Sequence, residues 1–510
     1  MSDQPPSSII AALLHHAATD PDRPCLQWGS ETFSYQTVAG LAAGWAEHFL
    51  RQGIHRGDRI GLFLPSSPNF LVAYLGVQMA GAVAVLINTQ YRQFELNHIL
   101  ADSEPRMVLC DAAGVTYIGA AAGSVGATLV VTTNEVQRKD AVAWRDEVPK
   151  PDQLAMLAYT SGTTGRSKGA MLTHSGLLAN SRAVGQAWQW TADDNLLLVL
   201  PLFHIHGLGV GVHGTLLAGA SISLHPRFVP AETLTALRSG QHTLFFGVPT
   251  MYTRLIDAFR EHASAAAIAN PAPTPLPLRL CVAGSAPLAP QTQLEFQRIF
   301  GQRILERYGM TETGMNIGNR YDGERRAGTV GVPFPNQEAQ VVDVQTRDVL
   351  PDGALGEIQV RGPHVFAGYW RNPDATAEVL QADGWFNTGD LGWRSTDGFY
   401  TITGRARELI ITGGYNVYPR EVEELLLNHP AVAECAVLGV PDPDLGEHVV
   451  AVIVPSKPAQ PPDPAHLTIY CREHLAAYKR PRTFHIMGAL PRNAMGKVQK
   501  ELLKERLGLL

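Results

Sequence analysis

Apolar positions along the chain follow two alternating patterns, which predict strands separated by helices. Short apolar runs over residues 59–64 and 107–110 are typical of buried strands, and the apolar periodicity of residues 70–79 is typical of a helix between them. Strands and helices in alternation favour layered α/β structure. We therefore expect a large α/β domain in the N-terminal part of the chain.

The last fifth of the chain shows a different order of elements. A strand over residues 409–411 is followed by a helix over 419–428, strands over 436–440 and 449–454, and a helix over 467–477. These elements are sufficient for a small α+β domain. We place the boundary after Gly404, so the predicted domains are residues 1–404 and 405–510. The predicted fold class is α/β and α+β in a multidomain chain.

Composition and charge exclude several classes of protein. The chain has 510 residues, of which 45% are hydrophobic, so it has material for more than one buried core and is not a disordered protein. Its 41 basic and 47 acidic residues give a net charge of −6 without a long basic run. This balance argues against nucleic acid or an anionic membrane as the main partner.

Cysteine usage and the N-terminal residues indicate the compartment. The five cysteines are scattered and contain no Cys-x-x-Cys pair, so they predict neither a disulfide framework nor a zinc site. The first residues lack the pattern of a signal peptide, and no apolar run is long enough to cross a membrane. We expect a soluble protein of a reducing cytoplasm without integral membrane association.

The segment Tyr159–Gly169 carries the clearest chemistry in the sequence. It combines three glycines with serine and threonine hydroxyls and with two cations, Arg166 and Lys168. Glycines leave backbone N–H groups free to wrap an anion, hydroxyls donate to phosphate oxygens, and Lys168 adds positive charge. The segment is not a Walker A loop, because Lys168 stands between Ser167 and Gly169. An ordinary surface loop would not need this order, so we predict a polyphosphate site.

This loop resembles the signature Ser-Gly-Thr-Thr-Gly-x-x-Lys-Gly of the adenylate-forming superfamily of acyl-CoA synthetases, adenylation domains and luciferases. Further signatures of the superfamily follow along nearly the whole chain in its order: Gly284-Ser285-Ala286-Pro287, Tyr308-Gly309-Met310-Thr311-Glu312, Thr388-Gly389-Asp390, Gly404-Arg405, Gly413-Gly414-Tyr415-Asn416-Val417 and Pro491-Arg492-Asn493-Ala494-Met495-Gly496-Lys497. The resemblance implies a large ATP- and acyl-binding domain and a small mobile domain that carries the catalytic lysine.

The resemblance also implies a reaction in two steps. A carboxylate attacks the α-phosphorus of ATP to give an acyl-adenylate and pyrophosphate, and a thiol then attacks the acyl carbon and expels AMP. ATP and Mg²⁺ would be the cofactors, and coenzyme A would be the co-substrate. The protein would position the reactants and neutralise the charge that develops between them.

Three segments would form the ATP site if the resemblance holds. Thr311 would contact the α-phosphate, and Glu312 would help to hold Mg²⁺, which is usually bound by a carboxylate together with phosphate oxygens. The phosphate-binding residues would be Thr160, Ser161, Gly162, Thr163, Thr164, Gly165 and Lys168. The residues around adenine would be Gly284, Ser285, Ala286, Pro287, Glu306, Arg307, Tyr308, Gly309 and Met310.

Two residues are assigned to the ribose by the same resemblance. Asp390 resembles the carboxylate that accepts hydrogen bonds from both ribose hydroxyls, with help from Arg405. Without the other motifs, an aspartate in this position would be interpreted as a turn or capping residue. The preceding Thr388-Gly389 and the order of the motifs favour the ribose role.

The predicted C-terminal domain would supply the catalytic lysine, Lys497, to the attacking carboxylate and the α-phosphate. Taken alone, Lys497 would be interpreted as an exposed surface lysine. The superfamily rotates this domain between the two steps about a hinge that is usually Asp or Lys, and the matching residue here is Arg407. Arg407 departs from that pattern but remains charged. After the rotation, a tunnel near Gly413, Gly414 and Tyr415 would admit the thiol.

The acyl pocket would include His204, which matches a position that closes it, together with Met315 and Asn316. His204 and His206 are two residues apart, as in some metal sites. Their setting is apolar, however, and the spacing places no third ligand. We therefore expect a pocket for an acyl group and not a metal centre.

Arg254 lies in an otherwise apolar stretch, where a snorkelling or salt-bridged arginine is the ordinary explanation. An inward guanidinium would instead suit a second carboxylate through bidentate contact. Residues 249–254, 282–286, 306–316 and 491–497 together resemble malonyl-CoA synthetases. That resemblance assigns Arg254 and Ser285 to the distal carboxylate, so the lead substrate is malonate or a methyl-substituted malonate.

Three alternatives remain open. The acid could be a short, medium-chain or aryl monocarboxylate, in which case Arg254 would be structural. The acyl group could be transferred to a separate carrier protein. The chain could also be a nucleotide-binding relative without catalysis, although Lys168, Glu312, Asp390 and Lys497 are all present and argue against this alternative.

Overall fold

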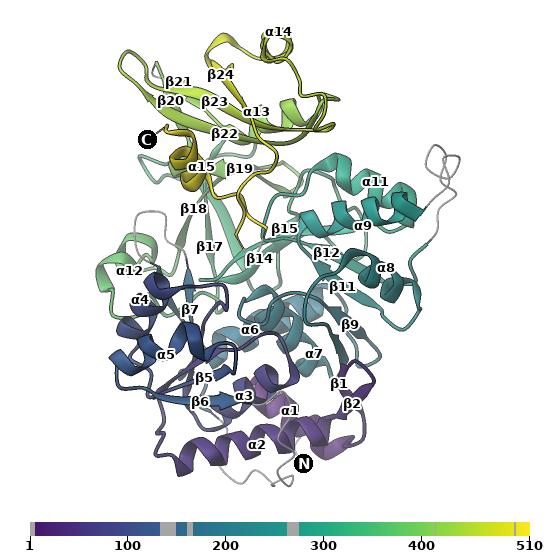
Figure 1. Ribbon diagram of the computed structural model, residues 1–510, viewed down its shortest axis with the longest axis vertical. Coiled ribbons are helices and arrows are strands. Elements are labelled where there is room, and N and C mark those ends of the chain that lie inside the picture. Colours follow the sequence, from purple (N-terminus) through teal and green to yellow (C-terminus); the bar gives the residue numbers. More distant parts are fainter. Residues whose placement is uncertain are drawn as a thin grey trace. The chain divides into compact units, whose positions relative to one another are not determined.

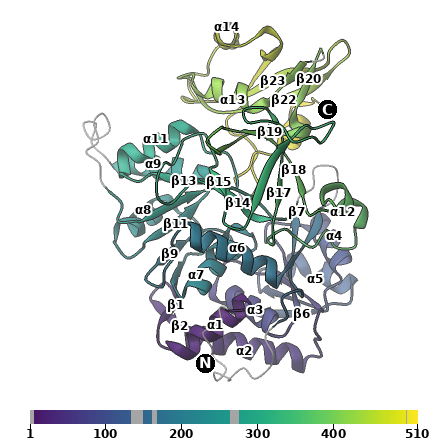
Figure 2. The ribbon, with the colours of Figure 1, turned by 180° about the vertical axis from the view of Figure 1, so that it is seen from behind.

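The computed structural model describes residues 6–132, 149–160, 167–262, 275–413, 415–493 and 496–509, and for Arg407 and Asn416 it describes the backbone alone. The chain forms two compact units (Figures 1 and 2). The first unit comprises Met1–Ala327, Gly331–Ala339 and Val360–Phe386, and the second comprises Gly328–Val330, Gln340–Gln359 and Asn387–Leu510. In the described ranges, no helix has the length and apolar character needed to cross a membrane.

The first unit contains two large sheets that are parallel in their centres. One sheet has the order β6 (Thr128–Thr132), β5 (Met107–Asp111), β3 (Arg59–Phe63), β4 (Val83–Leu86), β7 (Leu154–Thr160) and β8 (Lys168–Thr173). Its neighbours are parallel except for the antiparallel pair β7 and β8. The helices α4 (Gln93–Ser103) and α5 (Val115–Ser124) pack against its buried strand residues, and Figure 1 shows α5 beside β5 and β6.

The second sheet of this unit has nine strands. Their order is β15 (Val332–Pro333), β14 (Gly314–Gly318), β13 (Ile304–Met310), β12 (Leu280–Ala283), β11 (Leu244–Gly247), β9 (Asn195–Leu198), β10 (Ser221–Leu224), β1 (Pro24–Trp28) and β2 (Glu31–Ser34). The strands from β13 to β1 are parallel, and β14, β15 and β2 are antiparallel at the edges. Parallel strands end at one edge of a sheet, which is where ligands bind in such folds.

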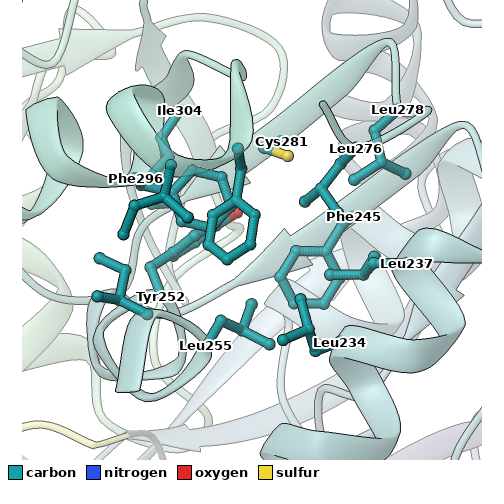
Figure 3. Packing of buried hydrophobic residues seen from close by; sticks show 14 of the residues in the cluster. Leu234, Leu237, Phe245, Tyr252, Leu255, Leu276, Leu278, Cys281, Phe296 and Ile304 are labelled. Atoms are coloured by element: carbon teal, nitrogen blue, oxygen red, sulfur yellow. The ribbon is translucent and has the colours of Figure 1, made fainter. Parts of the chain in front are cut away.

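One apolar cluster packs α8 (Pro230–Arg238), α9 (Pro249–His262) and α11 (Pro290–Phe300) onto this nine-stranded sheet. Figure 3 shows Phe245, Tyr252 and Phe296 meeting in its centre. Tyr252 packs edge to face with both rings and donates its hydroxyl to the carbonyl of Val282 at 2.7 Å. Truncating Phe296 to alanine would cost about 3–5 kcal/mol of stability, as for other fully buried aromatic residues.

The remaining helices of the first unit are α1 (Ile9–Thr19), α2 (Tyr35–Arg51), α3 (Pro68–Met79), α6 (His174–Ala187), α7 (His213–Ala218) and α12 (Pro373–Val379), with a π-helix, η1, over His206–Val212. Figure 2 shows α6 and α7 side by side. Helix α3 begins at Pro68 after the N-cap Ser67 and is buried along its whole length. Gly76 permits the close approach of α2, because a Cβ there would lie 2.5 Å from Cβ of Trp45.

The second unit contains two smaller sheets. One has the order β16 (Glu338–Val342), β17 (Gly356–Arg361), β18 (Phe386–Arg394) and β19 (Tyr400–Arg405). The other joins β21 (Tyr415–Val417), β20 (Ile410–Thr412), β23 (Gly446–Pro455) and β22 (Val432–Asp442), and β24 (Thr483–Ile486) pairs with β23. Helices α13 (Pro419–Leu427), α14 (Pro464–His474) and α15 (Lys500–Leu507) and the 3₁₀ turns η2 (Ala406–Glu408) and η3 (Ala477–Lys479) complete it. Figure 1 shows α13 against β22.

The predicted fold class is confirmed, with differences at the level of elements. The strands predicted over 59–64 and 107–110 are β3 and β5, and the helix predicted over 70–79 is α3, which begins two residues earlier. The last predicted helix begins three residues earlier, at Pro464. The boundary after Gly404 remains a prediction about which part moves, since the compact second unit also takes in β18 and β19.

Candidate active site

The predicted phosphate loop connects β7 to β8. These strands are antiparallel neighbours, and Thr160 pairs with Lys168 in their register. The predicted phosphate-binding residues Ser161, Gly162, Thr163, Thr164 and Gly165 lie outside the described residues. The strand pairing therefore fixes the two ends of the loop.

Helix α4 supports these ends through two contacts that the sequence did not predict. Nε2 of His98 lies 2.7 Å from the carbonyl oxygen of Ser167, so this nitrogen donates to a carbonyl that can only accept. The hydroxyl of Tyr159 donates to Oδ2 of Asp102 at 2.5 Å, and burial together with Asp102 raises the pKa of Tyr159. Neither His98 nor Asp102 belongs to a motif, so the sequence held no signal for them.

Tyr369 connects the predicted phosphate lysine to the predicted Mg²⁺ ligand. Nζ of Lys168 lies 5.2 Å from the centre of its ring, and its hydroxyl donates to Oε1 of Glu312 at 2.9 Å. Glu312 is buried, and its backbone carbonyl accepts from the N–H of Phe366 at 2.8 Å. Tyr369 follows Gly368 and forms an isolated β-bridge with Ala170, and it belongs to no motif of the sequence. The structure thus brings together a cation and a carboxylate that lie far apart in the chain.

The chemistry of this region fits Mg²⁺ held through ATP. Among the described residues, no three His, Cys, Asp or Glu side chains gather closely enough to hold a metal ion. A single carboxylate combined with phosphate oxygens is a usual way for proteins to bind Mg²⁺. Glu312 would be that carboxylate.

The predicted adenine segments meet at the carboxyl ends of β12 and β13. These strands are parallel, and Ala283 pairs with Glu306. The Oε1 atom of Glu306 accepts from the backbone N–H of Leu288 at 3.1 Å, which anchors the turn that carries Gly284, Ser285, Ala286 and Pro287. Tyr308, Gly309 and Met310 continue β13, and Gly309 faces the backbone of Gly314, where a Cβ would lie 2.2 Å from the carbonyl oxygen. Thr311 follows the end of this strand.

Arg307 points toward the turn at Ser285. A Cβ on Gly284 would come within 2.4 Å of its guanidinium carbon, so a side chain there would displace the guanidinium from its present position. Its Nη2 atom lies 3.5 Å from Oγ of Ser285, and that oxygen lies 3.2 Å from Nδ1 of His206. The structure therefore brings a cation, a hydroxyl and an imidazole together at this turn.

The charge of Arg307 is buried and lacks a counterion in the described part of the chain. The residue is 3% exposed, and its Nε atom has no hydrogen-bond partner there. Burial lowers the pKa of Arg307 to about 9, which still leaves the guanidinium charged at neutral pH. Burial and the nearby Arg307 lower the pKa of His204 to about 4, and they also lower the pKa of His206, so both rings are neutral. A buried cation among neutral groups is suited to an incoming anion.

The other residues predicted for the acyl pocket have different surroundings. Asn316 is buried. Its side-chain N–H donates to the hydroxyl of Thr313 at 2.8 Å, and its Oδ1 atom lies 2.9 Å from Nε2 of His364. Met315 is buried, and Asn180 bonds to its backbone on both sides. Arg254 lies exposed on α9. Its assignment to the distal carboxylate remains a prediction.

The predicted ribose residues form a pair within the second unit. Asp390 on β18 is opposite Arg405 on β19 in the strand register, and Nε of Arg405 lies 2.6 Å from Oδ1 of Asp390. Asp390 is buried, and its backbone N–H donates to the hydroxyl of Thr388 at 3.0 Å. This pairing orients the carboxylate that we predict for the ribose hydroxyls.

The predicted thiol segment and catalytic lysine also lie in the second unit. Gly413 and Tyr415 are exposed, and the ring of Tyr415 stacks on Tyr478 with centres 4.7 Å apart, whereas Gly414 lies outside the described residues. Lys497 is exposed, and its backbone N–H donates to Oδ1 of Asn493 at 3.0 Å. Arg407, the predicted hinge residue, lies in the turn η2.

The chain is similar to known proteins over nearly its whole length. The family model of AMP-binding enzymes matches residues 13–370, and the model of their C-terminal domain matches residues 421–497. A malonate–CoA ligase of Arabidopsis thaliana is 34% identical and covers 98% of this chain and 88% of its own. A sulfoacetate–CoA ligase of Cupriavidus necator is 35% identical, covering 97% of this chain and 96% of its own. The crystal structure of ATP-bound MatB from Rhodopseudomonas palustris is similar with a TM-score of 0.90, 38% identity and coverage of 98% of both chains.

The chain belongs to the AMP-binding enzyme family. Within this family it is an AMP-forming acid–CoA ligase, which uses ATP and coenzyme A. The predicted resemblance to the adenylate-forming superfamily is thereby confirmed. Other matching relatives are named for long-chain fatty acids and for indoleacetate, so membership of the family does not define the acid.

Proposed function

We propose that this ligase activates a small dicarboxylic acid, malonate or a methyl-substituted malonate, and converts it to the CoA thioester. The observation that carries the proposal is the buried guanidinium of Arg307, which has no counterion among the described residues and lies beside Ser285 and His206. One carboxylate of the acid would react at ATP, and the other would neutralise Arg307. The relatives named for malonate and sulfoacetate support this choice, since both acids carry a second anionic group.

The first half-reaction would proceed by charge neutralisation around ATP. Lys168 and Thr160 would hold the outer phosphates, and Thr311 would contact the α-phosphate. Glu312, oriented by Tyr369, would help to hold Mg²⁺, which would neutralise phosphate charge when bound. Lys497 would contact the attacking carboxylate and the α-phosphate, so the charge that develops between them is stabilised in the transition state.

The second half-reaction would require a different position of the C-terminal domain. Asp390 and Arg405 would keep the ribose in place, while rotation at Arg407 would withdraw Lys497 and present the segment of Gly413 and Tyr415. The thiol of CoA would then attack the acyl carbon and release AMP. Conformational steps of this kind commonly separate two half-reactions in one enzyme.

Pyrophosphate release with a panel of acids tests the proposal. We expect malonate and methylmalonate to give the highest kcat/KM and to yield a CoA thioester only when CoA is present. Propionate, butyrate and benzoate are the matched monocarboxylates. A preference for butyrate or benzoate would refute the dicarboxylate assignment, and turnover with a carrier protein that bears a free phosphopantetheine thiol, but not with CoA, would refute CoA as the acceptor.

A further inference from the structure

Lys500 lies three residues after the predicted catalytic lysine and makes two shielded ion pairs. Its Nζ atom lies 3.0 Å from Oε2 of Glu408 and 2.9 Å from Oε1 of Glu423, and the three side chains are only 18%, 27% and 20% exposed. Burial alone would lower the pKa of Lys500, but the two carboxylates outweigh it and raise that pKa, so the ammonium stays charged. The attraction between opposite charges is stronger when the charges are shielded from water.

The three charged groups belong to three different segments of the C-terminal domain. Glu408 ends the turn η2, which contains the predicted hinge. Glu423 lies on α13, and its Oε1 atom also accepts from the backbone N–H of Val437 on β22 at 2.9 Å. Lys500 begins α15 directly after the loop of Lys497. One ammonium group therefore joins the hinge turn to the body of the domain and to the catalytic loop.

The loop of Lys497 is also held on its other side. Nη2 of Arg492 lies 2.6 Å from Oε2 of Glu434 on β22, and its Nη1 donates to the carbonyl of Gly496 at 2.6 Å. The backbone N–H of Asn493 donates to the carbonyl of Lys497 at 2.9 Å. The base of the loop is thus closed by hydrogen bonds, and an ion pair anchors each end.

We propose that Lys500 is a positioning residue that ties Glu408, at the end of the hinge turn, to the Lys497 loop, so that Glu408 and the loop move as one body. Because Glu408 is anchored to this body, the rotation between half-reactions takes place in the residues directly before it, Ala406 and Arg407. Lys497 acts in adenylation alone, so an error in the placement of its loop slows that step and not thioester formation. The inference rests on the proposed two-step function and adds a residue to it.

Single-turnover kinetics of the two half-reactions test this role. We expect Lys500→Met to slow acyl-adenylate formation by about tenfold or more, which corresponds to about 1.4 kcal/mol in the barrier. Thioester formation from presynthesised acyl-adenylate and CoA should change by less than about threefold, a difference of well under 1 kcal/mol in the barrier. Lys500→Arg keeps the charge and should restore most of the adenylation rate. Equal losses in both steps, in parallel with a lower Tm, would show that Lys500 only stabilises the domain.

Glu408 and Glu423 provide a matched pair of milder variants. Glu408→Gln and Glu423→Gln each remove one carboxylate charge from Lys500, but only the first releases the hinge turn. We expect Glu408→Gln to lower the ratio of adenylation to thioester rates and to speed hydrogen exchange of the amides in residues 406–409, whereas Glu423→Gln should leave both unchanged. The same effect from both variants, or from neither, would overturn the proposal.

The exchange experiment separates this inference from the proposed function. Amide exchange is measured on the free enzyme and does not depend on turnover. If wild-type enzyme released no pyrophosphate with any acid, the proposed function would fail whatever the variants did. If wild-type enzyme were active and hydrogen exchange in residues 406–409 were the same in all variants, the proposed link through Lys500 would be refuted and the proposed function would stand.

Discussion

We expect Arg307→Met to reverse the substrate preference of the enzyme. The guanidinium is 3% exposed and has no carboxylate partner in the described part of the chain, so its contact with a substrate carboxylate would be made away from water. Removing one partner of such a buried charged pair costs about 2–5 kcal/mol. At tenfold per about 1.4 kcal/mol, kcat/KM for malonate should fall by about 30-fold to several thousand-fold. Activity on butyrate should hold or rise, since its apolar end would face methionine instead of a cation.

Thermal unfolding gives this prediction a second, independent readout. Methionine fills a similar volume without the cost of burying an unpaired charge, so the Tm of the free variant should stay the same or rise. A purely structural arginine would give the opposite result, with lower Tm and parallel losses on malonate and butyrate. Arg254→Met is the matched control on the exposed surface of α9. If it alone abolished the preference for malonate, the distal carboxylate would be bound by Arg254 and not by Arg307.

Three further predictions test other parts of the molecule. Tyr369→Phe keeps the ring beside Lys168 but removes the hydrogen bond to Glu312. Calorimetry should therefore show that Mg²⁺-ATP binds more weakly, by about 0.5–1.5 kcal/mol, whereas the binding of metal-free ATP is unchanged. Lys497→Ala should slow acyl-adenylate formation by about 100-fold or more and spare thioester formation from presynthesised adenylate; equal losses would assign Lys497 a structural role. Burial opposes ionisation of Asp194, but bonds from Arg279 and neighbouring groups outweigh it and lower its pKa. Asp194→Asn should therefore lower the Tm at neutral pH, and the difference from wild type should shrink as the pH falls below about 4 and through the lowered pKa of the folded-state carboxylate.

Elements with a strong apolar pattern could be predicted from the sequence, and weakly patterned ones could not. Strands β3 and β5 are almost fully buried, so their apolar runs are unbroken. Helix α3 begins at Pro68 after Ser67, which is a cap signal that would have corrected the predicted start. Strand β21 has three residues and β24 is half exposed, so neither produces a readable period.

Motif residues could be predicted because their neighbours in the sequence identify them. The residues that form hydrogen bonds or ion pairs with them could not be predicted. Glu312 lies in a signature, but Tyr369, which donates to it, lies 57 residues later in the chain and outside every signature. Lys500 follows the last signature, yet its partners Glu408 and Glu423 lie on segments that only the fold brings together. A hydrogen bond between distant segments leaves no local pattern, so it becomes visible only when the strands and helices are placed.

The two arginines of the acyl region show why the surroundings of a charge decide its role. The sequence assigned Arg254 to the distal carboxylate and Arg307 to adenine, in each case from adjacent motif residues. Adenine carries no negative charge, so it would leave the buried guanidinium of Arg307 uncompensated against Gly284 and Ser285. An exposed arginine on α9 is already solvated by water and gains little from a second anion. The residue that destabilises the free enzyme is therefore the one we expect to discriminate most strongly between a dicarboxylate and a monocarboxylate.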